Sequence, residues 1–457
     1  MNLVLLALAL AISWLPAAAW LWRIIPAGIP ARVPLVSGYA CLLGLLGTTL
    51  IMRVFSLLGV SWSLPGMALV SLVIALLAFV CPASGDGVGD PVPGRVRRQL
   101  SRPQQVLVAL CLALLASRLI ALGLELGTRP ITAWDAKQHW ARQAKVFFDL
   151  KSTAPFVSLE QWLALGGDGV YTNLHPDYPI ATPLLQAWIA VALGYWDNSL
   201  VNAPWLLMWL GIGLVFFAQA RLAGASIIVA LAACYMVLSL PYLNIHVALA
   251  GYADLLLALS YLGAVAALGN WLQSRASWQM ILALASGAGC LLVKNEGFYW
   301  LLSLGPGLLL AVAGLRRGLT VLAAAALALL LTLYWLPGDF AIAGHSLASM
   351  EFGYRPESWL SIYLSTLVHA NWHLLVYLLL IALLLVPMKA RAMIPLAAVV
   401  IAAICLYLTL YLVTDNAHGA VRFTSLNRVA LQLMPAAAFF TLSVFLIASG
   451  TAPGEKQ

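Results

Sequence analysis

Charged residues are scarce in this chain. Asp, Glu, Lys and Arg make up 9% of its 457 residues, whereas 63% are hydrophobic and the mean hydropathy is +0.96. Water-soluble domains carry about 25% charged residues, so this composition excludes a soluble enzyme and a disordered chain. Apolar runs of about 20 residues, the length that crosses a bilayer core, follow one another almost end to end. We therefore predict an all-α, polytopic transmembrane protein.

Closely spaced cysteines and basic stripes interleaved with aromatic residues are also missing. The six cysteines lie singly in or beside apolar runs, without the short spacings of metal or redox motifs, so we predict that they are packing residues. The net charge of +8 comes from 24 Lys and Arg against 16 Asp and Glu. No basic stripe interleaved with aromatic residues accompanies it, so no nucleic-acid partner is predicted. We interpret the excess as a topology signal.

The apolar runs define thirteen predicted spans. The first has no positive segment before it, so we keep it as a span; cleavage after Ala17, Ala18 and Ala19 is a minor alternative. The predicted spans cover residues 2–22, 33–57, 63–82, 104–127, 199–221, 224–243, 249–271, 277–294, 296–314, 318–336, 359–387, 392–413 and 428–449.

The positive-inside rule orients these spans. The densest basic cluster is Arg95, Arg97, Arg98 and Arg102, in or beside the Gly- and Pro-rich linker 83–103, which we place in the cytoplasm. Alternation then puts the N-terminus outside and the C-terminus inside. It requires the short apolar piece 181–195 to dip into the outer leaflet or lie on it without crossing. Residues 1–82 form three N-terminal helices, 104–336 a central module, and 337–457 the C-terminal helices.

The predicted outer face carries nearly all the acidic and histidine side chains that could take part in a reaction. It receives the loops 128–180, 337–358 and 414–427, and all acids except Asp86, Asp90 and Glu455. The seven histidines also fall outside or in outer membrane halves. This asymmetry predicts an active site on the extracytoplasmic face of a cytoplasmic (inner) membrane, in contact with the lipid bilayer.

The first outer loop contains Trp134, Asp135 and Lys137. Trp140, Ala144 and Phe147 follow at helical spacing, which predicts an amphipathic helix in the interface with Asp135 at or near its N-cap. Two interpretations of Asp135 stay open: it caps this helix, or its carboxylate deprotonates an acceptor.

A second group in this loop is His175, Asp177 and Tyr178, between Pro176 and Pro179. Prolines here predict a rigid turn. His175 and Asp177 are candidates for metal ligands, for acceptor contacts or for hydrogen bonds within the turn.

Two further segments carry charge at the outer ends of spans. Asp254 is the first charged residue of an apolar run. An acid at the edge of a membrane span usually has a function, and the alternative is that it caps the N-terminus of the helix. Lys294 and Glu296 lie in the hairpin before Gly297, and Lys294 either binds phosphate or pairs with Glu296.

The last outer loop holds Arg422 and Arg428, which suit a lipid phosphate or else lie at the membrane interface as snorkelling side chains. His369 and His373, four apart on a predicted span, are a weak metal pair that we interpret as packing residues.

In order, these motifs resemble the GT-C superfamily of membrane glycosyltransferases, over roughly residues 104–449. Trp134-Asp135-Ala136 occupies the place of the family's first acid, and Gly251-Tyr252-Ala253-Asp254 is similar to the Gly-Tyr-x-Asp element of oligosaccharyltransferases. The stretch from Tyr178 to Leu184 resembles the family's Pro-Pro-Leu segment, and the hairpin at 294–297 its Lys-Gly turn. The single acid at the first motif, the three extra N-terminal spans and the lack of a large soluble C-terminal domain depart from the pattern.

The resemblance implies inverting transfer from a polyprenyl-phosphate-sugar donor to a lipid, glycan or protein acceptor. Asp135 would be the general base, and Asp254, with His175 or Asp177, would bind the acceptor or a divalent metal ion, whose requirement stays open. Lys294, Arg428 and Arg422 would stabilise the leaving phosphate. A polysaccharide polymerase or ligase that uses a pyrophosphate-linked donor is one alternative, and a lipid or solute transporter is another.

Overall fold

The computed structural model describes residues 2–80, 100–342, 345–346 and 348–450. Helices account for 78% of the structure, and the strands are two short pairs, so the predicted all-α class is confirmed. Arg95, Arg97 and Arg98 lie outside the described residues, as do Cys81 and the acids that we place inside.

Nine helices in the described part of the chain are long and apolar enough to cross a membrane, so the protein is membrane-embedded. A bent pair, α9 (Ile227–Leu238) and α10 (Pro241–Leu249), makes a tenth if it counts as one span. The nine begin with α1 (Asn2–Ile24), α2 (Arg32–Leu57), α4 (Arg102–Thr128), α8 (Ala203–Leu222) and α11 (Asp254–Ser274), and continue with α13 (Glu296–Ala313), α14 (Leu315–Trp335), α17 (Ile394–Val413) and α19 (Leu426–Ala448).

The other predicted spans are shorter or broken. Two of them, α3 (Leu64–Val80) and α12 (Ser277–Val293), are apolar helices of 17 residues. The segment 224–243 is bent before Pro241, where α9 ends and α10 begins at an angle of 59°. A proline has no N–H to donate and restricts the residue before it, which accounts for the break.

The prediction of one continuous span over 359–387 is wrong. The segment divides into α15 (Ser358–Tyr363), a π-helical turn (Leu364–Val368), a 3₁₀ turn (Ala370–Trp372) and α16 (Leu375–Lys389). Polar side chains are the physical reason, because Ser365 and Asn371 both donate hydrogen bonds to Asn427.

His369 and His373 therefore do not share a helical face. His369 has an extended backbone, and His373 has a φ of 50°. Both residues are exposed, and the His369 ring lies 5.7 Å from the ring of Phe423.

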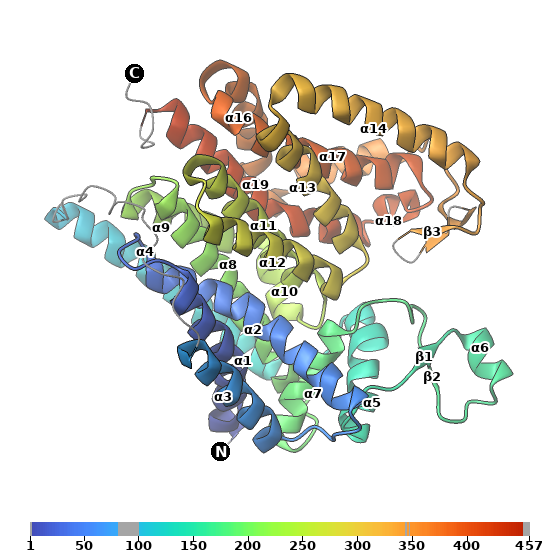
Figure 1. The fold of residues 1–457 in the computed structure, drawn as a ribbon. Coiled ribbons are helices and arrows are strands. Elements are labelled where there is room, and N and C mark those ends of the chain that lie inside the picture. Colours follow the sequence, from blue (N-terminus) through green and yellow to red (C-terminus); the bar gives the residue numbers. More distant parts are fainter. Residues whose placement is uncertain (1, 81–99, 343–344, 347, 451–457) are drawn as a thin grey trace. The chain divides into compact units, whose positions relative to one another are not determined.

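The chain forms two compact units. In the first, residues 1–239 and 243–259, α1 packs against α2 and α3, and α2 packs against α8 (Figure 1). Small residues allow the close approach: a Cβ on Gly38 of α2 would lie 2.7 Å from the backbone nitrogen of Val215 in α8. This packing of small residues is common between helices in membranes.

The short apolar piece after the first outer loop forms α7 (Ala181–Leu193). All 13 of its residues are buried, and it packs against α1, α2 and α5 (Arg142–Leu150). Protein thus surrounds a piece that we predicted to dip into the outer leaflet or lie on it without crossing. Its sequence is apolar all round, which is the pattern of a buried helix.

The loop before α7 has structure of its own. A π-helical segment, η1 (Ala136–Ala141), leads into α5. Beyond α5, strands β1 (Phe156–Val157) and β2 (Tyr171–Thr172) pair in parallel around α6 (Leu159–Ala164). Figure 1 shows β1, β2 and α6 as an excursion beyond α5.

In the second unit, residues 240–242 and 260–457, α13 packs against α12, α14 and α17, and α19 against α16 and α17. Strands β3 (Ala341–Ile342) and β4 (His345–Ser346) pair before α15. Backbone hydrogen bonds tie the loop 337–358 to the end of α17, from Arg355 N to Leu412 O at 2.8 Å and from Asp415 N to Met350 O at 3.0 Å.

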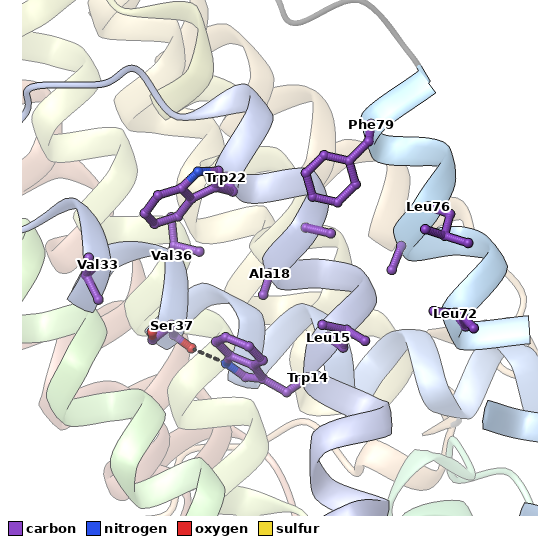
Figure 2. A pocket seen from close by; sticks show the side chains of 12 residues that line it. Trp14, Leu15, Ala18, Trp22, Val33, Val36, Ser37, Leu72, Leu76 and Phe79 are labelled. Carbon is purple, nitrogen blue, oxygen red and sulfur yellow. Dashed lines mark hydrogen bonds between the residues drawn. The ribbon is translucent and has the colours of Figure 1, made fainter. Parts of the chain in front are cut away.

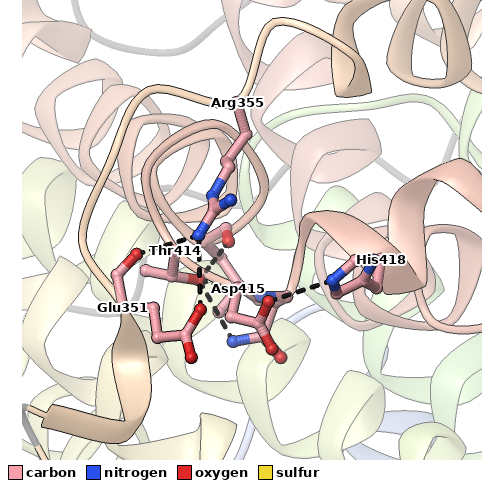
Figure 3. Close-up of polar contacts among 7 residues, drawn as sticks. Glu351, Arg355, Thr414, Asp415 and His418 are labelled. Atoms are coloured by element: carbon pink, nitrogen blue, oxygen red, sulfur yellow. Dashed lines mark hydrogen bonds and ion pairs between the residues drawn. The ribbon is translucent and has the colours of Figure 1, made fainter.

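Two ion pairs of this second unit lie in these loops, close in sequence to α15 and to the short helix α18 (Ala417–Val421). Arg355 meets Glu351 at 3.6 Å, and His418 meets Asp415 at 3.2 Å (Figure 3). Each ion pair lies within one loop, and the backbone hydrogen bonds join the two loops.

Candidate functional site

Asp135 lies in the first turn of the loop helix and is half-buried. The bond from Lys137 N to Ala133 O, 2.9 Å, starts the helix two residues before Asp135, whose own backbone is helical. Its side chain makes no capping hydrogen bond. Capping therefore does not account for this acid, although a carboxylate in a first turn still gains from the helix dipole.

The helical spacing predicted after Asp135 is confirmed. Trp140, Ala144 and Phe147 are each at most 1% exposed, so they form one buried face. The first turns are π-helical, a form that often occurs at functional sites. Edge contacts of Phe147 with Trp62 and Phe156 fix this face in the first unit.

The turn that contains the second acidic motif touches the start of this helix. Gly251 has a φ of +81°, and a Cβ built on it would lie 2.8 Å from the Ala136 Cβ. Only glycine combines this left-handed backbone with this contact. The structure thereby brings Gly251 against the residue that follows Asp135.

Asp254, three residues after Gly251, is fully buried in the first turn of α11. The turn before it is fixed, because Trp205 Nε1 donates to the Tyr252 carbonyl at 2.9 Å. Beside Gly251, Gln186 donates to Asn202 at 2.8 Å, and both amides are buried. A polar environment therefore lies inside the apolar core of the first unit at the acidic turn.

A cluster of rings packs at the start of the loop helix. His175 lies 4.9 Å from the rings of both His139 and Tyr178, and Tyr178 also stacks on Trp140. Trp134, 59% exposed, meets the His139 ring edge-on at 5.4 Å. The turn predicted at 176–179 is present, and it places His175 in this cluster, whereas Asp177 is exposed.

Sequence reasoning missed the centre of this cluster, His139 and Asn173. His139 Nδ1 lies 3.1 Å from Asn173 Oδ1, and Asn173 Nδ2 donates to the His139 carbonyl at 3.2 Å. Both residues are at most 5% exposed. The available signal was that Asn173 stands two residues from His175, inside the same motif.

In the second unit, Lys294 and Glu296 form an ion pair of 2.7 Å, as one of the two interpretations expected. Lys294 is 4% exposed, which is rare for a lysine. Gly297 makes this hairpin possible, since a Cβ there would lie 2.0 Å from the Cys290 carbonyl oxygen. The ends of α12 and α13 thus lie in contact and hold Lys294 in place.

Arg428, in the first turns of α19, belongs to the same neighbourhood in the second unit. Arg428, Lys294 and Glu296 all act electrostatically on the hydroxyl of Tyr411, which donates to Ser425 at 3.1 Å. Two of the predicted phosphate ligands are therefore within electrostatic range of one tyrosine hydroxyl. Arg422 is exposed at the end of α18.

The residues proposed for a metal do not form a ligand set. Within the described ranges no three His, Cys, Asp or Glu side chains gather closely enough to hold an ion. We assign no metal-dependent step to these side chains.

Arg53 is a second feature that sequence reasoning missed. It is the one charge inside the apolar run of α2 after Arg32. Its Nε and Nη2 atoms each expose less than 1 Å² and have no hydrogen-bond partner in the described part of the protein. A charge inside a predicted span was the signal that could have found it.

A cavity of about 400 Å³ lies in the first unit between the end of α4 and α10. The Glu125–Arg129 ion pair stands at its rim beside apolar residues such as Leu122 and Ile245. Asn244 lines it too and donates to the Leu238 carbonyl across the break between α9 and α10, at 2.8 Å.

Comparisons with protein-family models, with curated proteins and with solved structures found no match for this chain.

Proposed function

We propose that the protein is a membrane glycosyltransferase of the GT-C type. It moves a sugar from a polyprenyl-phosphate donor to a lipid, glycan or protein acceptor, with inversion, on the extracytoplasmic face of the cytoplasmic membrane. The contact between Gly251 and Ala136 is the observation that carries this proposal, because it joins two acidic motifs that the sequence separates by more than a hundred residues.

Asp135 is the proposed base. Its carboxylate is not used in capping, and it is half-buried beside an exposed tryptophan, Trp134. It takes the proton from an acceptor hydroxyl or amine while that atom bonds to the anomeric carbon. The bond from this carbon to the phosphate oxygen breaks, and polyprenyl phosphate leaves with the electron pair.

Asp254 and the ring cluster are the proposed acceptor contacts. A buried acid on a fixed turn can accept a hydrogen bond from a sugar hydroxyl, and aromatic rings can pack against the apolar face of a sugar. Lys294 and Arg428 are the proposed phosphate ligands, and Arg422 assists them. Cations stabilise the charge that develops on a leaving phosphate.

The test is sugar transfer by purified protein in nanodiscs with a panel of radiolabelled polyprenyl-phosphate sugars and a membrane extract as acceptor. Loss of a general base costs roughly 10²–10⁴-fold, so Asp135→Asn is expected to lose transfer to that extent. Asp149→Asn is the matched control, since Asp149 is an exposed acid in the last turn of α5.

Undiminished transfer by folded Asp135→Asn removes the base assignment. If every monophosphate donor stays intact but a pyrophosphate-linked glycan is consumed, the protein is a polymerase or ligase instead. If folded protein turns over neither donor class, the proposed transferase activity fails.

A further inference from the structure

The first three helices form an apolar groove of about 410 Å³, a volume within the range of small-molecule sites. Figure 2 shows its walls: Trp22 and Phe79 lie at one end, and Trp14 and Leu72 lie toward the other. Leu72 and Phe79 are about half exposed, so the groove opens on the outside of the unit.

Two indoles give the groove fixed walls. Trp14 Nε1 donates to the Ser37 carbonyl at 3.2 Å, which locks α1 to α2 (Figure 2). At the other end, the guanidinium of Arg32 lies 4.1 Å from the centre of the Trp22 ring. Ala18 stands between the two tryptophans, where its small side chain leaves space.

Arg32 places a positive charge at the rim. Its Nε and Nη2 donate to the carbonyls of Ile25 and Trp22, at 3.2 and 2.5 Å, just after α1 and before α2. These bonds fix the guanidinium beside the groove and leave further N–H groups for an anion, because an arginine has five donors. Arg23 is the next residue after Trp22, and the topology predicted from the sequence puts both arginines on the cytoplasmic side.

The chemistry of the occupant follows from this combination. In a bilayer an apolar groove gains little by exchanging one hydrocarbon neighbour for another, so its walls alone select no lipid. An arginine at the rim does select among lipids, because it pairs with a phosphate and favours a headgroup of net negative charge. We propose that this groove binds an acyl chain of an anionic phospholipid of the cytoplasmic leaflet, with its phosphate at Arg32.

This site is separate from the proposed transferase chemistry, and it gives the three N-terminal helices a role. A lipid bound here fills the space that α1, α2 and α3 leave between them. Its removal is expected to loosen α3, which packs mainly on α1.

Native mass spectrometry tests the proposal. Protein is exchanged from nanodiscs that contain equal amounts of phosphatidylglycerol and phosphatidylcholine, and the lipids still bound are counted. Wild type is expected to keep one phosphatidylglycerol. Arg32→Gln is expected to weaken it about fivefold, the equivalent of roughly 1 kcal/mol for one cation near a lipid surface.

Ala18→Leu fills the groove without touching the charge and is expected to release the same lipid. Arg275→Gln is the matched control: Arg275 lies 4.4 Å over Trp271, on the same predicted side of the membrane, and neither residue lines this groove. Melting curves identify any variant that fails to fold.

Equal retention of the two phospholipids overturns the proposal. So does retention of phosphatidylglycerol by folded Ala18→Leu, or an equal loss in Arg275→Gln. Because no sugar donor enters this assay, its outcome is independent of the transferase activity.

Discussion

Ala136 and Gly251 face each other so closely that a methyl group on Gly251 would lie 2.8 Å from the Ala136 Cβ. One belongs to the loop that carries Asp135, and the other to the turn that leads into Asp254. Because real Cβ atoms do not approach this closely, the contact fixes how near the two segments come. A change at either residue therefore moves an acidic motif, although neither side chain has chemistry of its own.

Gly251→Ala is expected to destabilise the protein and to lower any transfer activity. The substitution strains the left-handed backbone by about 1–2 kcal/mol and adds a steric clash of about 1–3 kcal/mol. Gly194→Ala is the matched control, with a φ of +82° but open space around the new methyl group. Thermal unfolding in detergent and an activity assay measure the difference. Equal losses in the two variants would mean that backbone strain, and not the contact with Ala136, decides the effect.

The sequence predicted the loop helix of this site better than the tertiary contacts around it. The buried face of the loop helix follows from helical spacing at Trp140, Ala144 and Phe147, because periodicity is a local property. The contact with Gly251 depends on how distant segments pack, and no local pattern encodes it. The burial of α7 was missed for the same reason: its length predicts that it does not cross the membrane, but not that α1, α2 and α5 surround it.

Asn173→Ala is expected to loosen the ring cluster and the loop around it. The change removes the amide that contacts both the ring and the carbonyl of His139, and it leaves a buried group unsatisfied at a cost of about 1–3 kcal/mol. Hydrogen exchange of residues 136–150 should rise. Asn416→Ala, in an exposed turn of the second unit, is the comparison. Unchanged exchange in Asn173→Ala would mean that stacking of Tyr178 on Trp140 suffices to hold the loop.

Gly297→Ala is expected to open the hairpin between α12 and α13 and to displace Lys294. A Cβ 2.0 Å from the Cys290 carbonyl oxygen forces backbone atoms apart, which no side-chain rotation relieves. Gly305→Ala, in the same helix with nothing within 4 Å, should instead stabilise by about 0.5–1 kcal/mol, the usual gain for alanine in a helix. Thermal unfolding separates the two. A Gly297→Ala protein as stable as Gly305→Ala would contradict the close crossing of these helix ends.

The broken segment at 359–387 shows a second limit of sequence reasoning. Its apolar composition favoured one long span, but Ser365 and Asn371 bond to Asn427 where the helix breaks. Two of them lie inside the run and the third on α19, so the bonds that replace the helix are tertiary contacts. Hydropathy averages over such residues, whereas the fold depends on where each donor finds an acceptor.

Arg53→Met is expected to raise the melting temperature. Arginine stays charged at any accessible pH, and two of its nitrogens are enclosed here without an acceptor in the described residues, at about 1–3 kcal/mol for each unsatisfied group. Methionine has a similar length and suits an apolar helix. Arg118→Met is the control, since Arg118 also lies inside an apolar helix, α4, but its nitrogens are not enclosed in this way.

A lower melting temperature in Arg53→Met alone would show that the guanidinium meets an anion in the membrane. Lipid or donor phosphate added to the wild type would then raise its melting temperature and leave that of the variant unchanged.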